Sequence, residues 1–245
     1  MNGNLKNTSP RVLVIIPAYN EGKNIAHVVA GIFSVVPEFD ILLINDGSRD
    51  NTAAEASAAG AIVISHLINM GYGVAIQTGY KYARENDYDF LVQIDGDGQH
   101  DPTYISKLLA PVISGETDIS IGSRFGEVES YRPSFSRLLG IYFFGKLVSI
   151  IIGSKITDPT SGYQAMNRDV IMFFTSDVFP CDYPDGDVLV SLKLLGFRIR
   201  EIPVRMFANA GGRTMHRGFK PMYYMFKMCL SILVTLLRKR ALYRR

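Results

Sequence analysis

Short apolar runs alternate with segments of helical pattern through the first hundred residues of the chain. Apolar runs at residues 11–16, 40–45, 61–65 and 90–94 have the length of buried strands. The segments between them place apolar or alanine residues three and four positions apart, which is the spacing of a helix with one buried face. Strands that alternate with helices predict an α/β fold, with a mostly parallel sheet and helices on both faces.

A polar cluster follows each of three predicted strands. The clusters are Pro-Ala-Tyr-Asn-Glu at 17–21, Asp-Gly-Ser at 46–48 and Asp-Gly-Asp-Gly-Gln at 95–99. The carboxyl ends of parallel strands share one edge of a sheet, where ligands bind, so these clusters are expected to converge on one crevice. The sequence contains neither G-x-G-x-x-G nor G-x-x-x-x-G-K-[ST], so a nucleotide bound there would be held in another way.

Asp95 and Asp97 are the clearest candidates for metal chemistry. They are spaced one residue apart, and the neighbouring glycines allow a tight turn and the close approach of a ligand. Mg²⁺ and Mn²⁺ prefer oxygen ligands and are usually held by one or two carboxylates together with substrate phosphates. The competing interpretation is a solvated acidic turn, because D-x-D also occurs by chance.

The composition is typical of a globular protein of one domain. The 245 residues are 47% hydrophobic and 20% charged, which is enough to bury a substantial core. The two cysteines, Cys181 and Cys229, have no metal-type spacing and indicate a reducing compartment. Residues 1–10 are polar and lack the apolar core of a signal peptide, so they are expected to form a flexible cytoplasmic tail.

Charge is distributed unevenly along the chain. Residues 198–245 contain 12 Lys or Arg and one acidic residue, whereas residues 1–197 contain 14 basic and 22 acidic residues. A basic C-terminal region on an acidic body favours an anionic partner, such as membrane lipid, phosphate or nucleic acid. A nucleic-acid-binding module is disfavoured, because the basic residues flank apolar side chains and the acidic clusters would be left unexplained.

Five motifs in order carry a resemblance to a known family. They are P-A-Y-N-E at 17–21, N-D-G-S at 45–48, N-x-G-x-G at 69–73, D-G-D-G-Q at 95–99 and G-S-R at 122–124. From about residue 11 to residue 217 the chain resembles the family 2 glycosyltransferases, above all their dolichol-phosphate mannosyltransferase-like branch, which attaches sugars to polyprenyl phosphates. The resemblance implies a GT-A (Rossmann-like) fold, a nucleotide-sugar donor, Mg²⁺ or Mn²⁺, and inversion at the anomeric carbon. Two positions depart from the pattern, since Asn45 replaces a common Asp and Tyr72 replaces a residue that is often basic.

The resemblance also implies roles on the donor side. Asp46 would accept hydrogen bonds from the nucleobase, Asp97 would bind the metal, and Arg124 would bind the phosphates. Asp95 would reach the ribose or the metal, with the Gln99 oxygen as a further ligand. The other residues expected around the nucleotide sugar are Pro17, Ala18, Tyr19, Glu21, Gly71 and Gly96. The alternatives are that Asp46 caps a turn, that Tyr19 is packing, and that Arg124 forms a surface ion pair.

Acceptor contacts are expected from two later segments. Residues 158–164 resemble the D-x-T-S-G-[FY] segment of the same branch, with Asp158 and Ser161 as candidates, although Asp-Pro and Ser-Gly also form ordinary turns. Residues 211–217 resemble a cationic loop that closes over phosphates. Its candidates are Arg213, with Arg217 and Lys220 behind it, and His216 as an alternative metal ligand. His100 is expected to support or cap the acidic turn, and His27 and His66 to be structural.

The chemistry of the acceptor decides whether the reaction needs a general base. A sugar hydroxyl must lose a proton as it attacks, so it needs a base, for which Asp185 or Asp187 is placed at the start of a predicted helix. Helix N-termini also attract acidic residues without any catalytic role. A polyprenyl phosphate is already anionic and needs cations rather than a base. The favoured prediction is therefore transfer to polyprenyl phosphate for glycan or polysaccharide assembly, with transfer to a sugar hydroxyl as the alternative.

Two apolar segments predict attachment to a membrane surface. Residues 131–153, within the catalytic domain at 11–217, form an apolar amphipathic helix, and residues 218–245 form a basic amphipathic one. Both are interrupted by charge and shorter than a confident membrane span. They favour helices that lie in the headgroup region at the cytoplasmic face, peripheral or monotopic. The alternatives are a buried core helix, a homo-oligomer contact, or a contact with a separate membrane protein.

Overall fold

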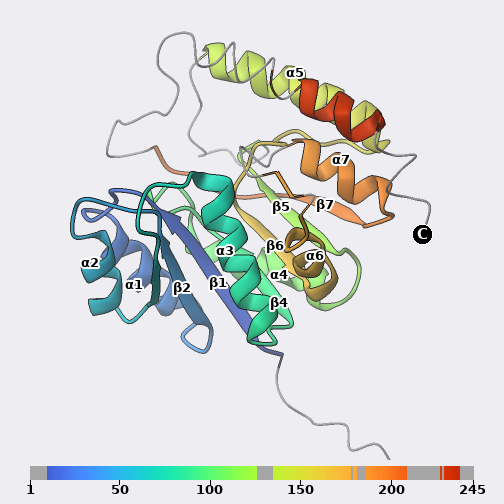
Figure 1. Cartoon of the computed structure of the whole chain (residues 1–245). Helices are drawn as coiled ribbons and strands as arrows, with labels where there is room; N and C mark the ends of the chain where they lie inside the picture. Colours follow the sequence, from blue (N-terminus) through green and yellow to red (C-terminus); the bar gives the residue numbers. More distant parts are fainter. Residues whose placement is uncertain are drawn as a thin grey trace, which may run out of the picture.

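The computed structural model describes residues 10–125, 135–177, 179–180, 186–208, 227 and 229–237 (Figure 1). The predicted tail at residues 1–10 lies almost wholly outside these ranges.

A seven-stranded sheet forms the centre of the molecule, in the order β3-β2-β1-β4-β6-β5-β7. Every neighbouring pair is parallel except those made by β6, which runs antiparallel to β4 and β5. The prediction of a mostly parallel sheet is therefore confirmed, with one reversed strand. The strands are β1 (Val12–Ala18), β2 (Asp40–Asn45), β3 (Ile62–Ser65), β4 (Phe90–Gln93), β5 (Ile119–Ser123), β6 (Gln164–Asn167) and β7 (Ile199–Pro203).

Helices cover both faces of this sheet, as predicted (Figure 1). Side chains alternate along β1, so that Val14 and Ile16 pack in one core with α1, α2 and α4. Leu13 and Ile15 pack in the other core, which includes α3, α5, α6 and α7. The helices are α1 (Ile25–Val35), α2 (Thr52–Ala58), α3 (Tyr72–Glu85), α4 (Ile105–Ile113), α5 (Phe135–Ile152), α6 (Arg168–Phe174) and α7 (Gly186–Leu194), with the 3₁₀ turn η1 (Pro102–Tyr104) before α4.

The topology brings the polar clusters to one edge. Strands β2 and β3 lie on one side of β1, whereas β4 lies on the other side. The boundary between β1 and β4 is therefore the topological switch point of the sheet. The carboxyl ends of β1, β2, β4 and β5 all point to that edge. Because β6 is antiparallel, the segment that precedes it, residues 158–163, also lies there. This edge is where ligands bind in open α/β sheets.

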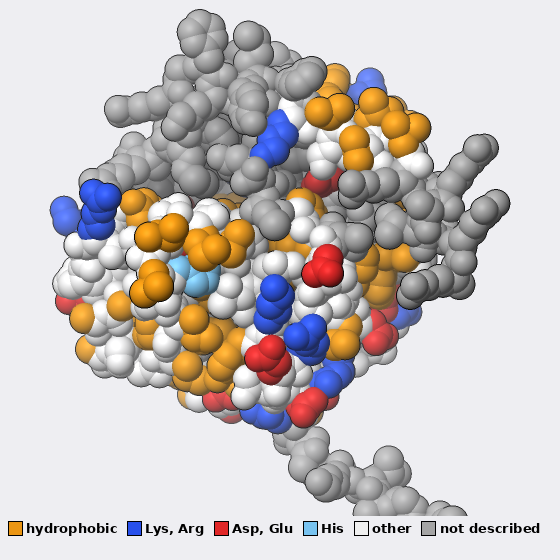
Figure 2. Space-filling model, viewed as in Figure 1, with side chains coloured by type: hydrophobic (Ala, Val, Ile, Leu, Met, Phe, Trp, Pro, Cys, Tyr) orange, Lys and Arg blue, Asp and Glu red, His pale blue; other side chains and the backbone are white. Residues whose placement is uncertain are grey.

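Helix α5 packs on the body of the protein through one side and exposes apolar side chains on the other. Phe144 and Val148 are buried in the same core as Ile232 of the C-terminal helix (residues 229–237). Among the side chains that the structure describes, the large apolar ones that are exposed here are Tyr142, Phe143 and Ile150 of α5 and Leu230, Leu233, Val234 and Leu237 of the C-terminal helix. Hydrophobic side chains gather over these two helices at the upper right of Figure 2. The apolar character of α5 is therefore not confined to its buried face.

None of the described helices has the combination of length and apolarity needed to cross a membrane.

Truncating a side chain is expected to cost much more stability on the buried side of α5 than on its exposed side. Phe144→Ala should lower the free energy of unfolding by about 3 kcal/mol, because it opens a cavity in the core. Tyr142→Ala should change it by less than about 0.5 kcal/mol, because that side chain is exposed. Urea unfolding of both variants measures the difference, and equal losses would mean that α5 is not packed as described.

Candidate active site

The loop after β4 carries the two predicted carboxylates. Gly96 lies against the end of β1, where an added Cβ would meet the Ala18 Cβ at 3.2 Å and the Pro17 carbonyl oxygen at 3.3 Å. Asp97 Oδ1 accepts the Gln99 backbone N–H at 3.0 Å. The Asp95 side chain remains 31% exposed. The glycine thus lets this loop pack closely on β1 while its carboxylates stay accessible at the edge of the sheet.

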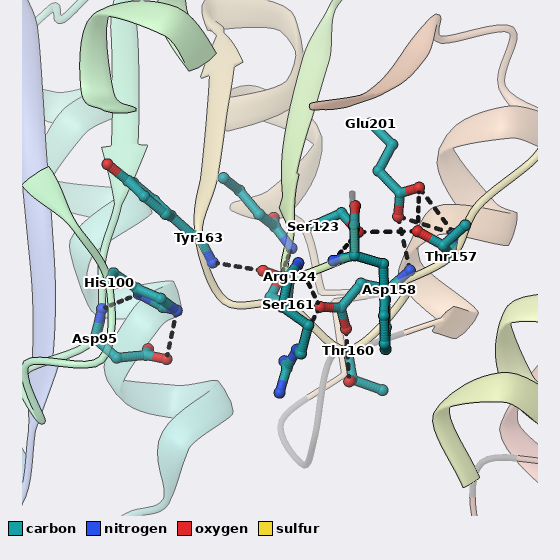
Figure 3. Close-up of polar contacts among 12 residues, drawn as sticks. Asp95, His100, Ser123, Arg124, Thr157, Asp158, Thr160, Ser161, Tyr163 and Glu201 are labelled. Carbon is teal, nitrogen blue, oxygen red and sulfur yellow. Dashed lines mark hydrogen bonds and ion pairs between the residues drawn. The ribbon is translucent and has the colours of Figure 1, made fainter. Parts of the chain in front are cut away.

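The His100 ring contacts both the backbone and the side chain of Asp95 (Figure 3). Its Nδ1 accepts the Asp95 backbone N–H at 3.1 Å, and its Nε2 lies 3.8 Å from Asp95 Oδ2. Its ring stacks on Tyr163, with centroids 4.9 Å apart. Burial lowers the pKa of His100 to about 4; Asp97 and Asp158 oppose this lowering, and Arg124 adds to it. His100 is therefore neutral near pH 7 and supports the acidic turn, as expected from the sequence.

The donor set of this loop fits Mg²⁺ or Mn²⁺. Asp95 and Asp97 supply carboxylate oxygens, and two such ligands plus phosphate oxygens and water are the usual environment of these ions. Among the described residues, no group of three or more His, Cys, Asp or Glu side chains could hold a metal by itself. The Gln99 main chain is already bonded, since its carbonyl accepts the Phe207 N–H at 2.7 Å, so its side-chain oxygen is the remaining candidate.

Asp46 is engaged mainly with the protein itself. Its Oδ1 accepts from His66 Nδ1 and from the Met70 N–H, each at 2.8 Å, and its Oδ2 accepts the Gly71 N–H at 2.9 Å. A carboxylate has about four lone-pair sites, so about one remains for a nucleobase. The turn that Asp46 closes is the one at 69–71, not the one that follows it in sequence. His66 is structural, as expected.

The loops after β1 and β2 are tied together. Asn20, in the left-handed region at φ 57°, donates its N–H to Ser48 Oγ at 2.9 Å and accepts the Arg49 N–H at 2.8 Å. Tyr19 is 45% exposed at this edge, which fits contact with a ligand. The other residues predicted to surround a base and ribose are less accessible: Pro17 and Ala18 are buried, and Glu21 is half-buried.

Arg124 and Asp158 form a buried ion pair (Figure 3). Arg124 Nε lies 2.6 Å from Asp158 Oδ2, and Asp158 is fully buried. Glu201 of β7 accepts the N–H groups of Thr157 and Asp158 and so holds this segment from behind. The predicted alternative of an ion pair is correct, but the pair is in the interior rather than on the surface. Because Asp158 binds Nε, the terminal amino groups of the guanidinium are not used by this ion pair.

The remaining acceptor and base candidates are buried or lie outside the described residues. Ser161 is buried, and its Oγ accepts the Tyr163 N–H at 3.3 Å, so it shapes the turn before β6. Asp187 is buried at the start of α7, where it accepts from the Val188 N–H and from the Ser231 hydroxyl of the C-terminal helix. These contacts give Asp187 a structural role. The candidates outside the described residues are Asp185, Arg213, His216, Arg217 and Lys220.

The sequence analysis did not predict two polar residues that the structure places at this site. Glu201 anchors the Asp158 segment, and Gln93 lies buried in β4 directly before the acidic loop. The sequence pattern could have identified Gln93, because it is a polar residue inside an otherwise apolar strand. It could also have identified Glu201, which is the one acidic residue among residues 198–245.

Polar loops at the switch point of an open sheet are typical of α/β proteins that bind nucleotides. The comparisons with known proteins identify the family. The sequence profile of Glycosyl transferase family 2 matches residues 13–174. The chain therefore belongs to glycosyl transferase family 2 and is a glycosyltransferase, which disfavours the nucleic-acid-binding alternative.

The relatives include enzymes named for polyprenyl phosphate. Undecaprenyl-phosphate mannosyltransferase of Micrococcus luteus is 30% identical, covering 85% of this chain and 88% of that protein. Polyprenol monophosphomannose synthase of Mycolicibacterium smegmatis is 34% identical, covering 66% of this chain and 63% of that protein. The solved structure of glucosyl-3-phosphoglycerate synthase from Mycobacterium tuberculosis with Mn²⁺ and uridine-diphosphate-glucose has a TM-score of 0.68 at 22% identity, covering 93% of this chain and 79% of that chain. This likeness supports the expected GT-A fold.

The neutral state of His100 predicts a loss of stability in acid. Its folded-state pKa of about 4 lies below the ordinary value of 6.5, so the unfolded chain binds more protons between these values. The stability that this group confers is therefore complete above pH 6.5 and falls as the pH decreases toward 4. Lowering the pH from 7 to 5 should cost about 2 kcal/mol through this group.

The matched variant is His100→Asn, whose side-chain oxygen can still accept the Asp95 N–H but does not titrate. Urea unfolding at pH 7 and pH 5 should show a smaller decrease for this variant than for the wild type. Parallel decreases in the two proteins would exclude His100 as the source of acid sensitivity.

The Arg124–Asp158 pair predicts a large cost when one partner is removed. Asp158→Ala should lower the free energy of unfolding by about 3 kcal/mol, because it leaves a buried guanidinium without its carboxylate. Glu116→Ala removes an ion pair of similar length with Arg200 on the surface and should cost less than about 1 kcal/mol. Similar losses in denaturant titrations of the two variants would contradict the buried position of Asp158.

Proposed function

We propose that this glycosyltransferase moves a sugar from a nucleoside diphosphate to a polyprenyl phosphate, with inversion, at the cytoplasmic face of a membrane. The observation that carries the proposal is the placement of Asp95 and Asp97 after β4 and of Arg124 after β5, at the same edge of the sheet. The names of the two relatives support the polyprenyl phosphate acceptor.

The residues of this edge account for the departure of the nucleoside diphosphate. A divalent ion bound there would neutralise charge on the leaving diphosphate. Asp97 and Asp95 would hold that ion, and Tyr19 would lie beside the nucleotide. Arg124, whose orientation is set by Asp158, would bind phosphate oxygens through its terminal amino groups. In the transfer, the bond from the anomeric carbon to the diphosphate breaks as a new bond forms to the acceptor phosphate oxygen.

The state of Asp187 favours a phosphate acceptor over a sugar hydroxyl. A phosphate oxygen is already anionic and has no proton to lose, so this transfer needs no general base. Asp187, one of the two base candidates, is buried and bonded to Ser231. It is therefore poorly placed to take a proton from a sugar. The acceptor phosphate would instead meet cationic residues, for which Arg213, Arg217 and Lys220 remain the candidates.

The exposed apolar face of α5 and the C-terminal helix supports attachment to the membrane. Among the described side chains of these two helices, seven large apolar ones are exposed, a density typical of an interaction surface. The basic residues 238–240 and 244–245 follow directly in sequence. An apolar face beside a basic cluster favours a helix in the headgroup region of anionic lipids.

A transfer assay tests the proposal. Purified protein is incubated with Mg²⁺ or Mn²⁺, a panel of radiolabelled UDP- and GDP-sugars, and undecaprenyl phosphate. Label should enter the organic phase with one of the donors. Donor turnover without labelled lipid would overturn the choice of acceptor and favour a sugar hydroxyl.

Asp97→Asn should reduce transfer at least a hundredfold, because it removes a negative ligand while keeping the acceptor for the Gln99 N–H. Asp169→Asn is the control, since it changes an exposed Asp at the start of α6, beyond the opposite end of β6. Its rate should equal that of the wild type. Full activity of Asp97→Asn would remove Asp97 from the metal site.

A further inference from the structure

A chain of three polar side chains leads from the core to Asp95. Tyr80 of α3 and Gln93 of β4 are both buried, and Tyr72 is the first residue of α3. The Tyr72 hydroxyl lies 3.1 Å from Asp95 Oδ1, the Gln93 amide nitrogen lies 2.8 Å from the Tyr72 oxygen, and the Tyr80 hydroxyl lies 2.5 Å from the Gln93 amide oxygen. The chain is continuous from Tyr80 to the carboxylate.

The direction of every bond in this chain follows from its last member. An ionised carboxylate only accepts hydrogen bonds, so Tyr72 donates to Asp95. The Tyr72 oxygen must then accept from the Gln93 amide nitrogen, which turns the amide oxygen of Gln93 toward Tyr80. Tyr80 supplies the proton for that bond, because burial, and secondarily Asp95, raise its pKa above the ordinary value of 10.0. All the donors therefore point toward Asp95.

Rigid elements hold this chain in place. Gln93 is paired in the sheet between Ile15 of β1 and Gln164 of β6. Tyr72 follows Gly71, which has φ 96° and donates its N–H to Asp46. The start of α3 is thus fixed by Asp46, and the middle of the chain is fixed by the sheet.

Gly162 covers the contact between Tyr72 and Asp95. A Cβ at this position would lie 2.7 Å from the Tyr72 hydroxyl and 2.9 Å from Asp95 Oδ2. The backbone before β6 therefore packs directly on this hydrogen bond, and any larger residue would displace it. Tyr72 from the start of α3 and Gly162 from the segment before β6 therefore both contact the Asp95 carboxylate, which follows β4.

The two sides of Asp95 are consequently held by different groups. Tyr72 binds Oδ1, whereas His100 binds the backbone N–H and lies near Oδ2. Rotation of the carboxylate about its last bond would break the contact with Tyr72. Oδ2 is then presented in one orientation, which suits a ligand of defined geometry such as Mg²⁺ or Mn²⁺.

We propose that Tyr72 is a positioning residue, whose hydroxyl, oriented through Gln93 by Tyr80, fixes the Asp95 carboxylate for a divalent cation. This inference rests on the proposed function, because it assumes that Asp95 faces the metal. It assigns a role to the tyrosine that departs from the family pattern at position 72. Groups that orient a metal ligand typically change metal affinity by about 10- to 100-fold when they are removed.

The test compares Tyr72→Phe with Tyr88→Phe. Tyr88 donates to Asp40 Oδ2 at 2.7 Å at the opposite edge of the sheet, so the control removes the same kind of bond away from the site. The probe is Mn²⁺ alone, with free ion measured by electron paramagnetic resonance. Tyr72→Phe should bind Mn²⁺ about tenfold more weakly or worse, whereas Tyr88→Phe should match the wild type. In the transfer assay, excess Mn²⁺ should restore the rate of Tyr72→Phe, which it would not do for a misfolded protein.

Tyr80→Phe provides a second variant that leaves Tyr72 in place and breaks the far end of the chain. It should weaken Mn²⁺ binding in the same direction but less. Wild-type affinity in both Tyr72→Phe and Tyr80→Phe would overturn the positioning role. If Asp97→Asn loses Mn²⁺ in that case, the proposed metal site stands without Tyr72. If Asp97→Asn also binds as the wild type does, the metal site and the positioning role both fail.

Discussion

The reversed direction of β6 is the constraint on which the site depends. A parallel strand at this position would carry residues 158–163 to the amino edge of the sheet, away from Asp95. As β6 is antiparallel, Asp158 meets Arg124 across a sequence distance of 34 residues, and Gly162 packs on Asp95. The segment that precedes this strand therefore supplies both the partner of Arg124 and the backbone that covers the Asp95 carboxylate.

The sequence predicted the elements better than the contacts among them. Strand β2 begins and ends at the predicted residues 40 and 45, because an apolar run bounded by Asp40 and by Asp46-Gly47 has clear limits. The pairing of Arg124 with Asp158 was not predictable in detail, since it depends on strand order rather than on local pattern. Tyr72 was recognised only as a departure from a motif, because its partner Gln93 is 21 residues away on another element.

Buried polar groups at this edge are satisfied by one another, which stabilises the geometry but reduces their freedom to bind ligands. Asp46 shows this most clearly, because three of its hydrogen bonds come from His66, Met70 and Gly71. An unsatisfied buried carboxylate would cost several kcal/mol, so such networks are rigid once they are complete. The Asp of the D-G-S pattern therefore organises the turn at residues 69–71, far from it in sequence.

The electrostatic balance of the acidic loop favours a divalent cation. Asp95 and Asp97 bring two negative charges to one turn, and a nearby imidazolium or guanidinium would oppose a metal there. His100 supplies no charge, because burial lowers its pKa to about 4. Arg124 supplies little net field, because Asp158 lies 2.6 Å from its Nε. The fold thus places a histidine and an arginine near the loop but keeps the histidine neutral and pairs the arginine with Asp158, so the negative charges of Asp95 and Asp97 are little offset by these two residues.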